Sequence, residues 1–204
     1  MLAGLILAAG QARRFGSDKR QVRLPNGDTL LAHTLSVYRA VCEPLHVVIG
    51  PEDALAQALC ERLGCRPVVN PDCTQGMGAS LACGVRAIEH DDPSGSVQGL
   101  IVGLADMPAV TSALIERVQH TLQALASSQP DRPVVPSYQG RLGHPRGIPR
   151  AWFDALRQLA GDQGARGAIP WHQAYRLEVD DPGVLIDIDT PADLNHWVRE
   201  KSTR

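Results

Sequence analysis

Near its N-terminus the chain carries the stretch Gly4-Leu-Ile-Leu-Ala-Ala-Gly-Gln-Ala-Arg-Arg-Phe-Gly-Ser-Asp-Lys19. A short aliphatic run ends here in a loop with two glycines six residues apart, whose backbone can turn N–H groups toward an anion. Three cations follow in the same loop, namely Arg13, Arg14 and Lys19. Arginine can bind phosphate oxygens bidentately, and lysine adds a mobile point charge. The stretch therefore predicts a phosphate-binding loop after a first strand, although a solvated basic loop would have the same composition.

Beyond this loop, short aliphatic runs alternate with longer amphipathic ones. We expect strands at Gly4–Leu7, Leu45–Ile49, Pro67–Val69, Leu100–Leu104, Pro133–Val135, Arg176–Val179 and Val184–Ile188. We expect helices at Thr29–Val41, Glu52–Leu63, Ala79–Glu89, Ser112–Leu125, Ala151–Leu159 and Ala192–Lys201. This alternation predicts one α/β domain over residues 1–204, a three-layer fold with a doubly wound, mostly parallel sheet. Ligands of such sheets bind at the carboxyl ends of the strands.

The composition narrows the function classes. A formal net charge of −2 gives no broad electrostatic reason to bind nucleic acid or an acidic membrane. No apolar run reaches the 18 residues that a membrane span needs. The five cysteines are odd in number and include no CxxC pair, as expected for reduced thiols of a cytoplasmic protein.

The loop lacks both the Gly-Lys-Ser/Thr of a P-loop and the GxGxxG of a dinucleotide fold. Its Leu7-Ala-Ala-Gly10, Arg14, Gly16 and Lys19 instead match LAAGxxxRxGxxK, so that the chain resembles the MobA-like nucleotidyltransferases. The resemblance implies a Rossmann-like nucleotidyltransferase fold. It also implies catalytic roles for Arg14 and Lys19, and nucleotide contacts from Leu7, Ala8, Ala9, Gly10 and Arg13.

Two acidic segments are candidates for a metal site. Asp106 follows the strand expected at Leu100–Leu104, where a lone aspartate could also cap a helix or form a turn. Opposite a cationic phosphate loop, its carboxylate suits Mg²⁺, and the resemblance assigns that role to the aspartate of this D-x-P segment. On a strand, Asp187 and Asp189 would share one face. We expect Asp189 to be the second ligand, with Asp187 as a possible support, and Mn²⁺ as an alternative ion.

Further motifs narrow the resemblance. Gly76 and Ser80 open a helix and could face a nucleotide, or could form a plain glycine-rich helix start. With Gly143-His-Pro145, Gly161–Arg166 and the D-x-D-T-P segment, the chain resembles the MocA-type molybdenum cofactor cytidylyltransferases from about residue 4 to residue 198. That resemblance implies acceptor contacts from His144 and Arg166. His144 could contact a pterin, contact a phosphate or stabilise its loop. Members often continue with aliphatic residues where this chain has Arg146-Gly-Ile-Pro149.

The resemblance implies transfer of CMP from CTP to the phosphate of molybdopterin-bound molybdenum cofactor, giving molybdopterin cytosine dinucleotide and pyrophosphate. An apo-molybdoenzyme of the xanthine dehydrogenase type would be a further partner. Ala9 stands where guanylyl-transferring relatives tend to carry a second glycine. The alternatives are a guanylyltransferase or sugar-phosphate nucleotidyltransferase of the same fold, a cofactor carrier, and an NAD(P)H-dependent reductase, for which the dinucleotide fingerprint is missing.

Overall fold

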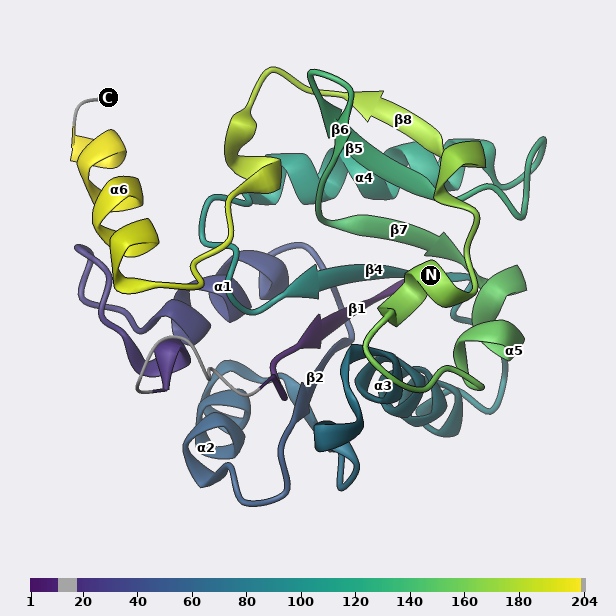
Figure 1. Cartoon of the computed structure of the whole chain (residues 1–204). Helices are drawn as coiled ribbons and strands as arrows, with labels where there is room; N and C mark the ends of the chain where they lie inside the picture. The colour runs from purple at the N-terminus through teal and green to yellow at the C-terminus, as the bar shows by residue number, and fades with distance from the viewer. Residues whose placement is uncertain (11–17, 203–204) are drawn as a thin grey trace.

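The structure is a computed structural model that describes residues 1–10 and 18–202 (Figure 1). Its strands form one eight-stranded sheet of order β3-β2-β1-β4-β7-β5-β6, with β8 paired to β5. The strands are β1 (Leu2–Leu7), β2 (Leu45–Ile49), β3 (Arg66–Val69), β4 (Gly99–Leu104), β5 (Val134–Tyr138), β6 (Arg141–Leu142), β7 (Arg146–Pro149) and β8 (Tyr175–Glu178).

Helices cover both faces of this sheet. They are α1 (Leu30–Arg39), α2 (Ala54–Leu63), α3 (Met77–Asp91), α4 (Ser112–Leu125), the short α5 (Phe153–Leu156) and α6 (Pro191–Ser202). Buried side chains of α1, α2 and α4 pack with one face of the sheet, and those of α3 and α5 with the other. Thr29 and Thr111 cap α1 and α4 through their hydroxyl oxygens, which accept backbone N–H bonds. The three-layer, doubly wound α/β prediction is confirmed.

The two halves of the sheet differ in strand direction. Strands β3, β2, β1 and β4 run parallel, and Leu7 at the end of β1 lies opposite both Val48 and Leu104. The carboxyl ends of three strands therefore meet at one edge. Beyond β4 the sheet is mixed, because β7 is antiparallel to β4 and β5, β6 is antiparallel to β5, and β8 is parallel to β5.

One expected strand was wrong. Within Val184–Ile188, the first two residues end a 3-10 helix (Pro182–Leu185), and residues 186–189 belong to no helix or strand. Val184 and Ile188 are nonetheless fully buried. Isolated backbone bonds hold this segment: the Val184 carbonyl accepts from His144 N at 2.9 Å, and Ile188 N donates to the Asp106 carbonyl at 2.9 Å. Two aliphatic residues of this segment are therefore buried, although the segment is not hydrogen-bonded into the sheet as a strand.

Two further expectations changed in the second half. The strand β7 was missed, because its sequence of Arg, Gly, Ile and Pro carries little β-propensity. The helix expected at Ala151–Leu159 is reduced to a 3-10 turn, Arg150–Trp152, and the four-residue α5. Both changes lie in the part of the chain where antiparallel strands pair with one another. There the expected alternation of strands and helices does not hold.

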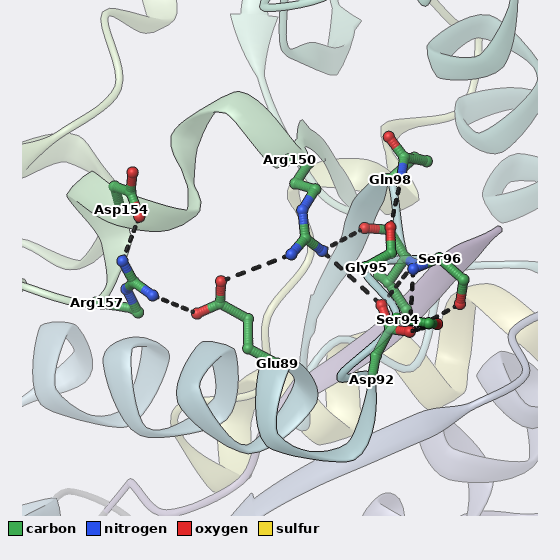
Figure 2. Close-up of polar contacts among 10 residues, drawn as sticks. Glu89, Asp92, Ser94, Gly95, Ser96, Gln98, Arg150, Asp154 and Arg157 are labelled. Atoms are coloured by element: carbon green, nitrogen blue, oxygen red, sulfur yellow. Dashed lines mark hydrogen bonds and ion pairs between the residues drawn. The ribbon is translucent and has the colours of Figure 1, made fainter.

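An ion-pair network joins the C-terminal end of α3 to the segment that carries α5 (Figure 2). Glu89 lies 3.1 Å from an Arg157 nitrogen and 3.9 Å from an Arg150 nitrogen. Arg150 also donates to the Val97 carbonyl at 2.7 Å and lies 3.8 Å from Asp92. The network fixes these segments against each other, at the end of α3 away from its first residue.

The cysteines Cys42, Cys60, Cys65, Cys73 and Cys83 are all free, as predicted. Of the helices in the described ranges, none has the length and apolar character that crossing a membrane requires.

Candidate active site

A cavity of about 590 Å³ opens at the carboxyl edge of the parallel strands. It is lined by the ends of β1 and β4, by the start of α3 and by acidic side chains from three separate segments. The lining residues that the sequence had indicated are Leu7, Ala9, Gly10, Lys19, Gly76, Ser80, Asp106 and Asp189. The structure therefore gathers most of the predicted site residues around one space.

Lys19 bridges two carboxylates in this cavity. Its Nζ donates to Asp106 Oδ2 and to Asp189 Oδ1, both at 2.7 Å. The Lys19 side chain is 14% exposed, against 21% for Asp106 and 45% for Asp189. Burial lowers the pKa of Lys19, but the charges and hydrogen bonds of the two aspartates outweigh it, and its pKa lies above the ordinary value. Lys19 is therefore a cation held on two carboxylates that the sequence places 83 residues apart.

Backbone contacts explain why these residues meet. Ala105 N, just before Asp106, donates to the Leu7 carbonyl at 3.2 Å and so continues the register of β4 beside β1. The bond from Ile188 N to the Asp106 carbonyl brings the segment before α6 to the same place. Asp106 and Asp189 are thereby fixed from two sides of the cavity.

The start of α6 orients Asp189. Asp193 Oδ2 accepts bonds from the backbone N–H of Asp189 at 3.1 Å and of Thr190 at 2.7 Å, and from the Thr190 hydroxyl at 2.8 Å. These bonds place the negative charge of Asp193 at the positive N-terminal end of α6. The expected shared strand face of Asp187 and Asp189 is wrong, because neither residue lies on a strand. The Asp187 residue is exposed, but its carboxyl group is partly desolvated. This desolvation, together with the charges of Asp189 and Asp106, raises the pKa of Asp187.

The site fits a divalent cation through two carboxylates. Asp106 Oδ1 is buried without a hydrogen-bond partner, while Asp106 Oδ2 and Asp189 Oδ1 already converge on one positive group, Lys19 Nζ. In the part of the chain that the structure describes, no group of three or more His, Cys, Asp or Glu side chains is arranged to hold a metal. Magnesium commonly uses one or two carboxylates and completes its octahedron with phosphate oxygens and water.

The start of α3 forms the opposite wall. Gly76 has a φ of +106°, and a Cβ there would lie 2.2 Å from Asp162 Oδ1. Only glycine can combine this conformation with such close packing. The Ser80 hydroxyl accepts from Asn70 Nδ2 at 3.1 Å, so its contact with a nucleotide would be shared with a neighbour. Helix α3 begins at Met77, two residues before the expected start.

Some predicted residues do not line this cavity. Ala8 is buried, and its carbonyl accepts from Arg20 at 2.7 Å. Arg13 and Arg14 lie outside the described residues, and their expected phosphate contacts stay predictions. Conversely, Cys73, Thr74, Met77 and Asp162 line the cavity without having been singled out. Cys73, Thr74 and Met77 lie within three residues of Gly76, and Asp162 lies within the Gly161–Arg166 segment.

A second cavity of about 540 Å³ adjoins the first and shares Leu7, Met77, Leu104 and Asp162 with it. His144 and Arg166, expected at the acceptor, line this second cavity. Burial lowers the pKa of His144 to about 3, and the charge of Arg146 adds to the effect. His144 is therefore a neutral imidazole near pH 7 in the folded protein, and such an imidazole would contact a phosphate through a hydrogen bond.

The doubly wound sheet, with a lysine and two aspartates at its carboxyl edge and two adjoining cavities, defines a protein of the nucleotidyltransferase class. Residues 4–175 match the family described as the MobA-like NTP transferase domain. This chain belongs to that family.

Several relatives are similar over nearly the whole chain. The purine catabolism protein PucB of Bacillus subtilis is 31% identical over 95% of this chain and 94% of its own length. A probable molybdenum cofactor guanylyltransferase of Mycobacterium ulcerans is 29% identical, with 97% and 94% covered. The nicotine blue oxidoreductase of Paenarthrobacter nicotinovorans is also 29% identical, with 93% and 92% covered.

Among solved structures, Rv0371c of Mycobacterium tuberculosis is 26% identical and superposes with a TM-score of 0.78, with 97% of each chain covered. The same protein has been solved in complex with manganese, and that structure gives a TM-score of 0.76 at 97% and 98% coverage.

Proposed function

We propose that this protein is a metal-dependent nucleotidyltransferase of the cytoplasm. In this proposal one domain transfers CMP from CTP to the phosphate of the molybdopterin-bound molybdenum cofactor. The products are molybdopterin cytosine dinucleotide and pyrophosphate. The family and the guanylyltransferase relatives support a nucleotidyl transfer to this acceptor. The choice of CTP rests on Ala9, whose methyl group lines the nucleotide cavity and would narrow it against a purine.

The observation that carries the proposal is the group Lys19, Asp106 and Asp189 in the first cavity, which adjoins the second. Two anions must approach each other in this reaction, and positive charge is needed between them. A divalent ion on Asp106 and Asp189, magnesium or manganese, would supply that charge and polarise the phosphate oxygens. The manganese complex of Rv0371c supports the presence of a metal in this fold.

The side chains of this protein would then act by positioning and charge neutralisation. Asp106 and Asp189 would hold the metal, and Lys19 would neutralise the polyphosphate, where Arg13 and Arg14 are expected as well. An oxygen of the acceptor phosphate forms a bond to the α-phosphorus of CTP, and the bond from that phosphorus to the bridging oxygen of pyrophosphate breaks. Pyrophosphate leaves with the electron pair. Because the acceptor is already an anion, the step needs no general base.

The test is to identify the product after incubation with each of the four NTPs, Mg²⁺ or Mn²⁺ and molybdenum-loaded molybdopterin. We expect pyrophosphate and the cytosine dinucleotide with CTP. The variant Asp106→Asn should lose activity by roughly 10²–10³-fold while keeping its thermal unfolding midpoint within a few degrees. Preference for GTP would replace the cytidylyl assignment with a guanylyl one. Full activity of Asp106→Asn would reject the site.

The non-nucleotidyl alternatives are separated in the same experiment. A carrier would bind the cofactor without releasing pyrophosphate from any NTP. A reductase would oxidise NADPH or NADH in the presence of its substrate, and that activity would persist without any NTP. If the transfer is confirmed, a second assay should follow delivery of the product to an apo-molybdoenzyme of the xanthine dehydrogenase type, the expected partner.

A further inference from the structure

Arg146 is a buried arginine in the second cavity. It follows the Gly143-His-Pro145 segment, at a position where members of the MocA-type family often carry an aliphatic residue. It is only 9% exposed, and its guanidinium carbon lies 4.3 Å from the centre of the Trp171 ring. Its one hydrogen bond among the described residues is a long one, from Nε to the Gly143 carbonyl at 3.4 Å. Most donors of the guanidinium are therefore without an acceptor among the described residues.

Among the side chains that the structure describes, none forms an ion pair with this arginine. Neither Arg146 nor Arg166 lies within 4.0 Å of a described carboxylate oxygen, although Asp162 lines the same cavity. Burial and the positive charge of Arg166 lower the pKa of Arg146 to about 10. The cavity thus holds two neighbouring arginines and one aspartate, and neither arginine has an ion-pair partner among the described side chains.

Arg150, four residues further along, shows what a structural arginine looks like in this fold. It also lies over an aromatic ring, at 5.3 Å from the centre of Phe153. Unlike Arg146, it is surrounded by Glu89 and Asp92 and by the Val97 carbonyl (Figure 2). An arginine that is buried without such partners costs stability, because its desolvation is not compensated. The cost is offset when a ligand brings the missing negative charge.

A second polar group in this cavity also lacks its partner. His144 Nδ1 is buried without a hydrogen bond, and the imidazole lines the cavity beside Arg146. A neutral imidazole can donate to or accept from a ligand without adding charge. Two neighbouring residues therefore offer unused hydrogen-bonding groups to the same space.

The position of Arg146 separates this space from the reacting atoms. The β4–β7 ladder pairs Arg146 with Val102, and Asp106 lies four residues beyond Val102. Asp106 lies past the end of β4 at Leu104 and lines only the first cavity, whereas Arg146 lines only the second. A group bound by Arg146 is thus distinct from a phosphate that reacts beside Asp106.

We propose that Arg146, stacked on Trp171 and assisted by Arg166, forms a second anion-binding subsite that recognises an oxyanion or carboxylate at the end of the acceptor away from its reacting phosphate. The assignment of this group to the acceptor rests on the proposed function. The binding of an anion at Arg146 does not, and the two parts can be tested separately.

The binding test uses Trp171 as a reporter in a variant with Trp152→Phe and Trp197→Phe, whose folding is checked by circular dichroism. Inorganic phosphate is titrated without metal or nucleotide. We expect a saturable change in Trp171 fluorescence, and an affinity about tenfold weaker or worse after Arg146→Gln. Lys19→Ala, which removes the cation of the first cavity, should leave the change intact. Arg132→Gln is the control for loss of an arginine near an aromatic ring, since Arg132 lies 5.6 Å from the centre of the Tyr175 ring, outside both cavities.

No change in the folded reporter, or an equal affinity after Arg146→Gln, would overturn the subsite whatever the enzyme activity. In the kinetic test, Arg146→Gln should raise the KM for the acceptor about tenfold, with the KM for the NTP nearly unchanged. An equal rise in both KM values, while phosphate binding still depends on Arg146, would remove the acceptor assignment. Absence of transfer to any acceptor would reject the proposed function and leave the phosphate titration to decide on the subsite.

Discussion

Lys19 gives the sharpest test of the site, because its role in binding metal should be opposite to its role in turnover. In the structure its Nζ lies 2.7 Å from Asp106 Oδ2 and from Asp189 Oδ1, so a divalent ion that bound through these two oxygens would have to displace it. Removing Lys19 should therefore tighten metal binding in the absence of nucleotide. It should also slow transfer, because Lys19 can no longer neutralise the polyphosphate.

The size of the first effect follows from the two bonds. A hydrogen bond between charged groups contributes about 1.5–3 kcal/mol. Asp189 is 45% exposed and its bond is screened by water, so we count the bond to Asp106 at the lower value. Without Lys19, the metal no longer has to replace this bond of about 1.5 kcal/mol, so it should bind roughly tenfold more tightly. The loss of turnover should be roughly 10²–10³-fold.

Mn²⁺ affinity can be measured by titration calorimetry or by the electron paramagnetic resonance signal of free Mn²⁺, for the unmodified protein and for Lys19→Ala. Arg23→Ala is a matched control, because Arg23 is a nearby cation that donates to the Gly27 carbonyl and does not line the cavity. Weaker Mn²⁺ binding by Lys19→Ala, or affinity unchanged from the control, would show that the ion does not share the oxygens of Asp106 and Asp189.

Three further outcomes are expected. Gly76→Ala should lower stability by about 1–3 kcal/mol in denaturant unfolding, because its φ is +106°. Gly10→Ala should unfold like the unmodified protein, because no atom of the described residues lies within 4 Å of a Cβ added there. Equal losses would contradict the strain argument. His144 has a pKa of about 3 when folded and an ordinary value of 6.5, so the unfolded chain binds the extra proton between these values. The free energy of unfolding should fall as the pH drops from 6.5, by up to about 1.4 kcal/mol per pH unit, and His144→Gln should flatten this part of the profile. Asp193→Ala should cost about 1 kcal/mol of stability and weaken Mn²⁺ binding through Asp189, and an unchanged Mn²⁺ affinity would show that the helix start does not orient that carboxylate.

The first half of the fold could be predicted because its local signals agree with its tertiary structure. The strands that end at Leu7 and Leu104 are aliphatic and buried on both faces, and the segments that follow them carry charged residues. Lys19 and Asp106 could therefore be placed at one edge of the sheet from the sequence alone. The second half follows different rules. A pairing such as β4 with β7 depends on partners about 50 residues apart, and Arg146 has the composition of a surface position. Its burial depends on Trp171, which no sequence period indicates.

Asp189 lies beside Lys19 and near Asp106 as expected, but through a different local structure. The alternation of Val184, Ile186 and Ile188 predicted a strand, and that strand led us to expect Asp189 beside Asp106. The residue is in that place because Ile188 bonds to the Asp106 carbonyl and Asp193 caps the following helix. Both contacts depend on the packing of distant segments, and a single sequence carries no direct signal for them.

The reversal of strand direction at β4 has a consequence for how members of such a fold can diversify. Since β7 runs opposite to β4, it is the beginning of β7, together with the turn that precedes it, that reaches the ligand edge. Insertions or exchanges in residues 139–145 would thus remodel one cavity while the parallel strands that build the other keep their register. In the proposed reaction, the specificity for the acceptor could then change independently of the specificity for the nucleotide. A chimaera that exchanges only residues 139–145 and β7 would be expected to use a different acceptor with the same nucleotide.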